Sequence, residues 1–473
     1  MKPVVVIIGR PNVGKSTLFN RLTRSRAALV ADMPGLTRDR QYGDGRVGDR
    51  PYFVVDTGGV VDALGINAPR SELTGSISAQ TRQALSEADS AILLVDGREG
   101  LHPADRELAR ELRRLGKPLW LVINKTENID SDVAAAEFHA LGLTDPMPIS
   151  SAHGQGIDEL MERVLADLPR VEPEAEQREV PRIAIIGRPN VGKSSLVNAL
   201  LGEERVVVCD EPGTTRDAIH VPFERDGKRY ILIDTAGVRR KGRVHEVVEK
   251  FSIIKTLQAV NDADVAILVV DASEGVTEQD TGLAGYALEQ GRAMVIAVNK
   301  VDVLDSGQRL WIEQQVARKL SFLDFARTHH ISALKGTGIG GLFASVDKAH
   351  AAAWLDMSTP RLTRVIEAAV QATPAPVRHG RRIRVKYAHQ GGKNPLRVIV
   401  HGSQVGSLPE SYRRYLGNAV RRAFKLEGAP VLIECRQQSN PFAPKTERKP
   451  VDRDKARRQR AEGKKERRKK NRS

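Results

Sequence analysis

Short apolar runs, rich in β-branched residues, recur along the first 300 residues, and segments of helical length separate them. In the first part of the chain these runs are VVVII (4–8), YFVVD (52–56), AILLVD (91–96) and PLWLVIN (118–124). Four runs of the same kind follow later: RIAII, YILID, VAILVVD and AMVIAVN. Nearly continuous apolar strands that alternate with helices predict a parallel sheet covered on both faces. The pattern therefore predicts two doubly wound α/β domains.

These two domains are copies of one unit, because the stretch GRPNVGKS occurs at 9–16 and again, unchanged, at 187–194. The spacing between equivalent motif positions is 178 residues for three pairs, then 175, then 182: Gly9 and Gly187, Thr37 and Thr215, Asp56 and Asp234, Asn124 and Asn299, Ser150 and Ser332. A constant spacing with loop-sized changes indicates a duplicated domain of about 165 residues. We assign the first copy to residues 1–168 and the second to 182–357. The segment 169–181, rich in Pro and Glu, is typical of a linker.

The pattern changes near Pro360. A helical stretch, RLTRVIEAAVQA, leads to the alternating strand RRIRVKYA and the strand LRVIVHG, and then come the helical SYRRYLGNAVRRAF and the strand PVLIECR. This order predicts a small α+β domain over residues 358–440. Residues 441–473 form a basic tail, because 445–472 hold 15 basic and 5 acidic residues without an apolar face. We expect this tail to be disordered in isolation.

Charge is distributed unevenly along the chain, whose formal net charge is +15. Residues 361–473 hold 30 Lys and Arg against 9 Asp and Glu, an excess of +21, which leaves 44 against 50, or −6, for the rest. Such asymmetry points to a polyanionic partner engaged by the C-terminal end. With only two cysteines and no run of 18 apolar residues, we expect a cytoplasmic protein that does not engage membrane.

Each copy of GRPNVGKS directly follows an apolar run and matches the phosphate-loop pattern GxxxxGK[ST]. Its glycines let successive backbone N–H groups surround phosphate oxygens at the positive end of the next helix. We expect Lys15 and Lys193 to reach the β- and γ-phosphates, and Ser16 and Ser194 to ligate Mg²⁺. The candidate phosphate-binding residues are Gly9, Arg10, Pro11, Asn12, Val13, Gly14, Lys15, Ser16 and Thr17, and Gly187, Arg188, Pro189, Asn190, Val191, Gly192, Lys193, Ser194 and Ser195.

The motifs DTGG (56–59) and DTAG (234–237) each close a predicted strand. At that position an Asp can hold Mg²⁺ through water, and the last glycine N–H can sense a γ-phosphate. A threonine between the first helix and this strand is a candidate ligand for the metal and the γ-phosphate. These candidates are Asp56, Thr57, Gly58, Gly59 and Thr37 in the first copy, and Asp234, Thr235, Ala236, Gly237 and Thr215 in the second. The candidate catalytic set is Lys15, Thr37, Asp56, Gly59, Lys193, Thr215, Asp234 and Gly237.

The motifs NKTE (124–127) and NKVD (299–302) predict that the base is guanine. A carboxylate can accept hydrogen bonds from guanine N1–H and N2–H₂, a donor pair that adenine lacks. The Asn can meet the opposite edge of the base, the Lys stem can pack along the ring, and nearby backbone N–H groups can bind O6. These roles fall to Asn124, Lys125, Glu127 and Ser151, and to Asn299, Lys300, Asp302, Ser332 and Ala333. Both copies are therefore expected to bind GTP and GDP.

Together these motifs resemble the tandem GTPases of the Der (EngA) family. The resemblance covers GRPNVGKS, PGTTRD, DTAG and NKVD, and also GVRRKGRV (237–244) and SYRRYLGNAVRRAF (411–424). It implies two P-loop GTPase domains followed by a KH-like domain that packs against them. It also implies a role in assembly of the large ribosomal subunit, with GTP-dependent binding to its rRNA and proteins. We expect a monomer that does not bind DNA.

Three features bear on the GTPase chemistry. Glu127 stands where the family has Asp, so we expect retained but weaker guanine selectivity in the first copy. Val60 and Val238 follow DTGG and DTAG, where Ras-like enzymes have a water-positioning Gln, which predicts slow intrinsic hydrolysis. Asn12 and Asn190 resemble asparagines by which related GTPases bind K⁺, which implies K⁺-stimulated hydrolysis. The alternative is that these asparagines only stabilise the loop.

Alternative functions stay open. In one, the first copy is a nucleotide-filled scaffold and the chain is an adaptor with a single working switch; Glu127 and the lack of a first-copy counterpart to RRKGR (239–243) favour it. A GTPase of RNA modification would need a further catalytic domain, for which no segment remains.

The third domain lacks the GxxG of RNA-binding KH domains, since GSQVG (402–406) has three intervening residues. The spacing of its aromatic residues favours core packing over base stacking: Tyr387, Tyr412, Tyr415 and Phe424.

Overall fold

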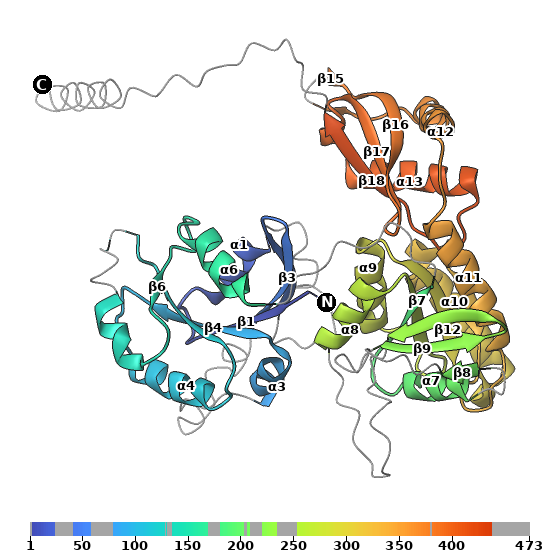
Figure 1. The fold of residues 1–473 in the computed structure, drawn as a ribbon. Helices are drawn as coiled ribbons and strands as arrows, with labels where there is room; N and C mark the ends of the chain where they lie inside the picture. The colour runs from blue at the N-terminus through green and yellow to red at the C-terminus, as the bar shows by residue number, and fades with distance from the viewer. Residues whose placement is uncertain are drawn as a thin grey trace, which may run out of the picture.

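Figure 1 shows the computed structural model, which describes residues 2–23, 41–57, 79–127, 129, 135–168, 180–202, 206–208, 220–233, 253–378 and 381–437. Several residues singled out above lie outside these ranges: Thr37, Gly58, Gly59, Val60, Thr215, Asp234, Thr235, Ala236, Gly237 and Val238. The segment RRKGR and the C-terminal tail lie outside them too, as does almost all of the predicted linker.

The first repeat is built on a six-stranded sheet in the order β2-β3-β1-β4-β5-β6. Only β2 runs antiparallel to its neighbour. The strands are β1 (Val4–Ile8), β2 (Gln41–Val47), β3 (Arg50–Asp56), β4 (Ser90–Asp96), β5 (Leu119–Asn124) and β6 (Met147–Pro148). The helices are α1 (Lys15–Leu22), α3 (Ala79–Glu87), α4 (Pro103–Arg113) and α6 (Ile157–Ala166), with a 3-10 helix η2 (Glu137–Leu141).

Both faces of this sheet are covered, which explains its continuous apolar runs. Val5 and Ile7 of β1 join a buried cluster with α1 and α6 residues, whereas Val4, Val6 and Ile8 join one that includes α3 and α4. Successive strand residues point to opposite faces, so a strand buried on both sides needs an apolar residue at every position. All five residues of β1 are accordingly buried.

The second repeat has the same architecture in a seven-stranded sheet, ordered β13-β12-β11-β7-β10-β9-β8. Its strands are β7 (Arg182–Ile186), β8 (Val206–Val208), β9 (His220–Arg225), β10 (Lys228–Ile233), β11 (Val265–Asp271), β12 (Ala293–Asn299) and β13 (Arg327–His330). Its helices are α7 (Lys193–Leu201), α8 (Ile253–Asp262), α9 (Glu278–Glu289), α10 (Ser306–Lys319) and α11 (Gly340–Ala353), with 3-10 helices η5 (Val301–Val303) and η6 (Ser321–Leu323).

The two repeats touch through a polar network around Asp44 of β2. Lys2 Nζ lies 2.6 Å from Asp44 Oδ1 and 2.8 Å from Asn261 Oδ1 of α8. Gln290 Nε2 donates to Asp44 Oδ2 at 3.1 Å, and the buried hydroxyl of Tyr286 lies 3.5 Å from the same oxygen. One cluster of buried apolar side chains also includes residues of both repeats. The first repeat is therefore joined to helices α8 and α9 of the second.

The C-terminal domain pairs a three-stranded sheet with two helices, α12 (Thr359–Ala372) and α13 (Glu410–Phe424). The strands β16 (Arg384–Gly392) and β17 (Arg397–Ser403) are antiparallel, and β18 (Leu432–Gln437) runs parallel to β17. A short hairpin of β14 (Val377–Arg378) and β15 (Arg381–Arg382) precedes them, and a 3-10 helix η7 (Val405–Ser407) follows β17. Figure 1 shows this domain beside the second repeat.

Several contacts join the C-terminal domain to the second repeat. Two are backbone hydrogen bonds of Gly428, which accepts from Met294 N at 2.6 Å and donates to Phe325 O at 2.8 Å. The amide of Asn394 donates to Asp264 Oδ1 at 2.5 Å, and this carboxylate is fully buried. Arg421 adds an ion pair with Asp324 at 2.7 Å. Backbone bonds and a buried polar pair fix the position of this domain closely.

The expectation that the aromatic residues of this domain are core residues is right for three of them and wrong for one. Tyr412 is buried, the Tyr415 hydroxyl donates to Ala369 O at 2.9 Å, and Phe424 packs against the domain core. Tyr387, in contrast, is 37% exposed on β16. Strict alternation from Val385, which packs against the core, would turn Tyr387 inwards as well. A shift in register between Val385 and Tyr387 moves the pattern by one residue, so Ala388 takes the buried position and Tyr387 points away from the helices.

In the part of the chain that the structure describes, the helices are too short and too polar for any of them to cross a bilayer.

Candidate nucleotide-binding sites

Each phosphate loop connects the first strand of its repeat to the helix that begins at the motif lysine. Gly14 and Gly192 precede helices α1 and α7 with φ of 99° and 96°. A Cβ atom on either glycine would lie 2.3 Å from the side-chain amide nitrogen of Asn124 or Asn299. A side chain is excluded on two grounds, the left-handed backbone and this close approach. The loop glycine and the guanine-motif asparagine thus fit together in both repeats.

The motif lysines are buried and bonded to their own loops. Lys15 Nζ donates to Arg10 O at 2.6 Å, and Lys193 Nζ donates to Arg188 O at 2.8 Å. Each ammonium group therefore lies over the loop where the sequence places the phosphates. A lysine that donates to a carbonyl there can exchange it for a phosphate oxygen, which is a stronger partner because it is charged.

A hydroxyl and a carboxylate meet next to this lysine in the first repeat. Ser16 Oγ donates to Asp56 Oδ2 at 2.7 Å, although 40 residues separate the two in sequence. Oxygen donors of this kind suit Mg²⁺, which is usually held by few protein ligands and completed by water and phosphate. Ser16 and Asp56 therefore fit the predicted metal site. In the second repeat Ser194 occupies the same position on α7, whereas Asp234 lies outside the described residues.

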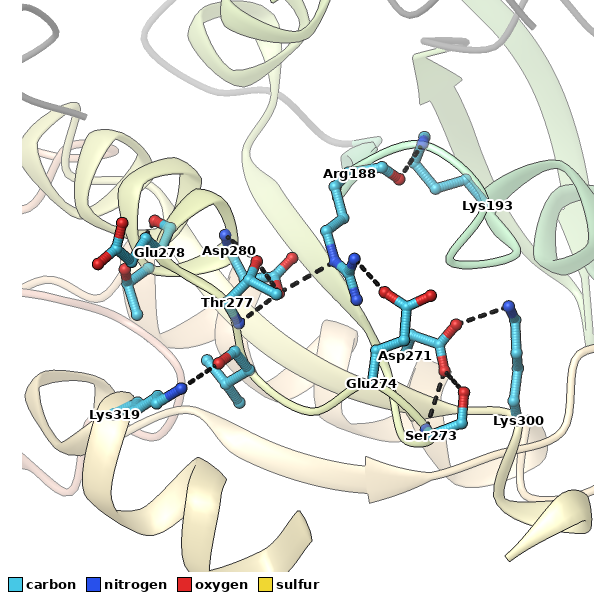
Figure 2. Close-up of polar contacts among 12 residues, drawn as sticks. Arg188, Lys193, Asp271, Ser273, Glu274, Thr277, Glu278, Asp280, Lys300 and Lys319 are labelled. Atoms are coloured by element: carbon cyan, nitrogen blue, oxygen red, sulfur yellow. Dashed lines mark hydrogen bonds and ion pairs between the residues drawn. The ribbon is translucent and has the colours of Figure 1, made fainter. Parts of the chain in front are cut away.

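The loop arginines point away from the lysine tips and bind carboxylates. Arg10 Nε donates to Asp105 Oδ1 at 2.8 Å, and its Nη1 lies 3.1 Å from Glu99. Burial opposes the charge on Arg10, but the bonds to these two carboxylates outweigh burial and raise its pKa. Figure 2 shows the equivalent contacts of Arg188 in the second repeat, with Glu274 and Asp280. These contacts hold the guanidinium groups on the carboxylates.

These carboxylates also cap the helix that follows. Asp105 is the third residue of α4 and accepts from the backbone N–H of His102 at 3.2 Å. Asp280 does the same in α9, where it accepts from Thr277 N at 2.9 Å. A capping box of this form satisfies backbone donors at the helix start. Because one carboxylate holds both a helix and a phosphate loop, the loop is fixed to the scaffold.

The guanine-motif asparagines connect three loops of each repeat. Asn124 Nδ2 donates to Val13 O at 2.8 Å, and its Oδ1 accepts from Ser151 N at 2.9 Å. Asn299 bonds Val191 O and Ala333 N, both at 2.8 Å. The asparagines therefore tie the phosphate loop to the loop expected to bind guanine O6. In each repeat the asparagine lies about 110 residues from its partner in the phosphate loop and about 30 residues from its partner in the guanine loop.

The neighbouring lysines lie on the strand-end carboxylates of β4 and β11. Lys125 and Lys300 have left-handed φ of 67° and 66°. Their ammonium groups lie 2.5 Å from Asp96 and 2.6 Å from Asp271, and Figure 2 shows the second pair. Burial alone would raise the pKa of Asp271, but the hydrogen bonds from Lys300 and Ser273 outweigh it and lower the pKa. The ion pairs stretch the lysine stems across the place predicted for the base.

The two carboxylates expected to read guanine have different neighbours. Glu127 accepts from Ser150 Oγ at 2.7 Å and pairs with Arg98. The hydrogen bond from Ser150 is the main reason that the pKa of Glu127 is lowered, and the charge of Arg98 contributes. Asp302 pairs with Lys335 at 3.6 Å, and a hydrogen bond from Ser332 lowers its pKa. Both groups are therefore anionic at neutral pH.

A cavity of about 640 Å³ opens beside the second repeat's guanine loop. It is lined by Ser195, Asn198, Ala199 and Gly202, and by Ala333 to Gly336. In the first repeat Arg21 takes the position of Ala199 and donates to Ser151 O at 3.3 Å and Ala152 O at 2.5 Å. The arginine therefore ties α1 to the guanine loop, where the second repeat has open space.

Sequence reasoning missed several residues that shape both sites: Glu99, Asp105, Asp96 and Arg98, and their equivalents Glu274, Asp280 and Asp271. A signal for them exists in the sequence. VDGREG (95–100) and VDASEG (270–275) repeat with the 175-residue spacing of the asparagines. An alignment of the two repeats across these segments pairs Asp96 with Asp271 and Glu99 with Glu274, the acids that bind the lysines and arginines.

Comparison with known proteins finds matches to three segments of the chain. A family model described as "50S ribosome-binding GTPase" matches residues 4–125 and again 182–300. A second, described as "KH-domain-like of EngA bacterial GTPase enzymes, C-terminal", matches residues 357–436.

Curated relatives extend over nearly the whole chain. A protein named GTPase Der from Aromatoleum aromaticum (strain DSM 19018 / LMG 30748 / EbN1) is 56% identical over 444 residues, which cover 93% of this chain and 99% of the relative. GTPase Der from Azoarcus sp. (strain BH72) is 55% identical over 447 residues, with 94% and 100% covered. A solved structure of an Aquifex aeolicus Era variant bound to GDP and AlF4⁻ is 27% identical, covers 46% of this chain and 75% of its own, and has a TM-score of 0.30.

Proposed function

Since the chain belongs to the family of GTPase Der and is a GTPase, we propose that it is a GTP-operated switch that binds the large ribosomal subunit and acts in its assembly. The observation that supports this proposal best is the matched construction of the two repeats. Equivalent lysines, asparagines and arginines make equivalent bonds in both. The basic excess after residue 361 supplies a surface for rRNA phosphates.

The residues of each site divide the work of binding GTP. Glu127 or Asp302 accepts the guanine donors, and Asn124 or Asn299 holds the loops that enclose the base. The phosphates lie on the backbone N–H groups at the start of α1 or α7, where the helix dipole favours negative charge. Lys15 or Lys193 leaves its loop carbonyl to bind the β- and γ-oxygens. Mg²⁺ bound at Ser16 and Asp56, or at Ser194, would neutralise phosphate charge.

For hydrolysis we propose that K⁺ binds beside Asn12 and Asn190 and supplies positive charge near the transferring phosphate. Both asparagines are exposed on their loops at φ of 65° and 63°. A left-handed asparagine also suits a loop in which it only stabilises the backbone. The rate of GTP hydrolysis distinguishes K⁺ binding from this purely structural role. With K⁺ in place of Na⁺ we expect hydrolysis to be about tenfold faster or more. Asn190→Ala should remove that difference in the second repeat without lowering the affinity for GDP.

Co-sedimentation with purified large ribosomal subunits tests the switch. The full chain is incubated with a non-hydrolysable GTP analogue or with GDP, alongside Lys15→Ala, Lys193→Ala and the control Lys228→Ala. Lys228 is exposed and pairs with Asp347, so its removal deletes one lysine charge outside either nucleotide site. We expect the analogue to promote binding, each phosphate-loop variant to lose it, and the control to keep it.

Two other results would change the conclusion. If only Lys193→Ala loses binding, the first repeat is a scaffold and the chain is an adaptor with one working switch. If the analogue and GDP give the same binding, the chain is not a nucleotide-operated switch on this subunit, and the proposal is wrong.

A further inference from the structure

The sheet of the C-terminal domain has two unlike faces. Val398 and Val400 of β17, with Ala388 of β16, pack into the apolar cluster formed with α12 and α13. Strand residues alternate between faces, so His401 and its cross-strand partner Tyr387 lie on the opposite face. In the part of the chain that the structure describes, neither α12 nor α13 covers this second face, and Figure 1 shows both helices on one side of the sheet.

Three aromatic rings form a compact cluster on this open face, and the rings of Tyr387 and His389 lie 6.2 Å apart. The rings of Tyr387 and His401 lie 4.5 Å apart and within 7° of parallel. The ring of His389 lies 5.1 Å from that of His401, at 19°. Burial, together with the charges of His389 and Arg436, lowers the pKa of His401, so the stacked imidazole is neutral at neutral pH. Tyr387, at 37% exposed, presents ring surface to solvent at the edge of this cluster.

The rim of this face carries a positive charge excess. Arg436 of β18 is paired across the sheet with His401, and Arg384 of β16 with Ser403. Glu434 is the one acidic residue in β16, β17 and β18. Its carboxylate oxygens lie 3.5 Å from Arg397 Nη1 and 4.0 Å from Arg436 Nη2. One carboxylate cannot neutralise these arginines. An exposed aromatic stack bordered by arginines has the composition of a surface that binds unpaired nucleotides.

We propose that this open sheet face, the Tyr387 face, is a binding site for single-stranded RNA. One or two unpaired bases stack on Tyr387 and His401, and the arginines at the rim hold the flanking phosphates. The lack of GxxG removes the usual clamp of RNA-binding KH domains, and the Tyr387 face provides a different surface. The proposal deepens the proposed function, since it rests on that function only for the source of the RNA, the ribosomal subunit.

Single-stranded RNA fits better than the other occupants that an exposed face can have. A duplex keeps its bases stacked inside and cannot offer one to a ring, whereas loops and single strands can. An apolar protein surface would offer no partner for the positive charge that Glu434 leaves uncompensated at the rim, which is costly. RNA satisfies both the rings and the charges. Docking of another part of this chain on the Tyr387 face is the alternative that the test must separate.

The test measures binding of a single-stranded RNA of about 12 nucleotides to the full chain. The RNA carries 2-aminopurine at its centre, because stacking on an aromatic ring quenches the fluorescence of that base. Affinity comes from fluorescence anisotropy over a series of KCl concentrations. The variants are Tyr387→Leu, which keeps apolar bulk but removes the π-face, and Tyr387→Phe, which keeps the π-face. Arg436→Ala removes a rim charge.

Tyr387→Leu should weaken binding by about 5- to 150-fold at every salt concentration and abolish the quenching, since stacking is worth about 1–3 kcal/mol per base. Tyr387→Phe should bind and quench as the wild type does. Arg436→Ala should instead lower the slope of log affinity against log salt by about 0.7. Arg414→Ala is the matched control, because Arg414 lies exposed on α13, where it pairs with Glu410. It should leave the quenching unchanged.

Several outcomes would overturn the proposal. Unchanged affinity and quenching in Tyr387→Leu would mean that RNA binds elsewhere, as on the basic tail. Equal effects of Arg414→Ala and Arg436→Ala would mean a general charge effect. If Tyr387→Leu binds RNA normally but sediments differently, the face docks another part of the chain. Should Tyr387→Leu fail to fold, the salt slope of Arg436→Ala decides.

This test is separate from that of the proposed function. If the wild type binds the RNA through Tyr387 but shows no nucleotide-dependent binding to ribosomal subunits, the Tyr387 face stands and the ribosomal switch falls. If subunit binding is normal and the oligonucleotide result is negative, the switch stands and the Tyr387 face falls.

Discussion

The two repeats carry the same nucleotide-binding skeleton on two different surroundings. Their lysine and asparagine contacts have nearly the same lengths, 2.6 and 2.8 Å for the lysines and 2.8 to 2.9 Å for the asparagines, and their arginines bind equivalent carboxylates. They differ around the base. The first repeat has Arg21 on the guanine loop and Arg98 on the guanine carboxylate, whereas Ala199 and Ser273 take these positions in the second.

This difference indicates which residues can alter nucleotide binding in one repeat without disturbing the motifs. Residues inside the motifs contact one another, so a change at one requires a change at its partner. The residues at the rim contact only one motif each and can vary between copies. Each extra arginine of the first repeat holds a part of the base site in place. We therefore expect the repeats to respond alike to changes in the skeleton and differently to changes at the rim.

The largest effect is expected where the repeats are the same. In Gly14→Ala or Gly192→Ala the new Cβ meets an asparagine amide at 2.3 Å on a left-handed backbone. The strain alone costs about 1–3 kcal/mol, and the displaced asparagine releases the guanine loop. Calorimetric titration with GDP should show the number of sites per chain fall from two to one for either variant.

Matched controls separate the clash from the backbone strain. Gly116 and Gly227 have φ of 65° and 75°, and nothing lies within 4 Å of their added Cβ atoms. Gly116→Ala and Gly227→Ala should lower stability but keep both nucleotide sites. If Gly192→Ala removes a site and Gly14→Ala does not, the two phosphate loops are not equivalent.

The motifs explain why so much of the skeleton could be predicted. The fold class is confirmed by the two matched GTPase segments and the matched KH-like segment, because the apolar runs and motif spacings are local properties of the sequence. The predicted roles of the individual site residues stay predictions. The role of Arg21 could not be predicted from the motifs, since its partners are backbone carbonyls about 130 residues away in sequence.

Tyr387 shows a second limit of sequence analysis. Alternation along a strand tells which residues share a face but not which face is covered. The orientation of Tyr387 depends on the packing of α12 and α13 and on the register shift that precedes Tyr387 in β16, neither of which can be read from the alternation. The contact between the repeats could not be predicted either, because charged residues such as Lys2 and Asp44 are usually found on the solvent-exposed surface.

The next prediction concerns the contact between the repeats, which depends on Asp44, an aspartate that only the first repeat has. Asp44 accepts bonds at the boundary with α9, whereas Pro222 takes its place in β9 of the second repeat. Asp44→Ala leaves the buried Tyr286 hydroxyl and the Lys2 ammonium without this carboxylate. We expect the free energy of unfolding to fall by about 1–3 kcal/mol, measured by urea denaturation. Asp49→Ala, a fully exposed carboxylate beyond the end of β2, should change little; equal losses would mean that the contact contributes nothing specific.

A smaller effect is expected from exchanging the residues at the guanine loop. Arg21→Ala removes two hydrogen bonds to loop carbonyls, and we expect GDP to leave the first repeat about two- to tenfold faster. Ala199→Arg should slow release from the second repeat by filling the cavity beside its loop. Stopped-flow fluorescence with labelled GDP, in a chain whose other site is disabled, gives each rate. Arg163→Ala, an exposed arginine paired within α6, is the control, and an equal change there would contradict the role of Arg21.

The smallest effect tests whether Arg98 compensates for the longer acid of the first repeat. The arginine is 56% exposed, so its ion pair with Glu127 is worth less than about 1 kcal/mol. Arg98→Ala should therefore lower the preference of the first repeat for GDP over inosine diphosphate, which lacks the N2 amino group, by about two- to fivefold. In a Glu127→Asp background the shortened carboxylate withdraws from the arginine, and Arg98→Ala should then have almost no effect. A double-mutant cycle of these four chains isolates the pair. If Arg98→Ala acts equally in both backgrounds, the arginine contributes only general charge, and Glu127 reads guanine without its help.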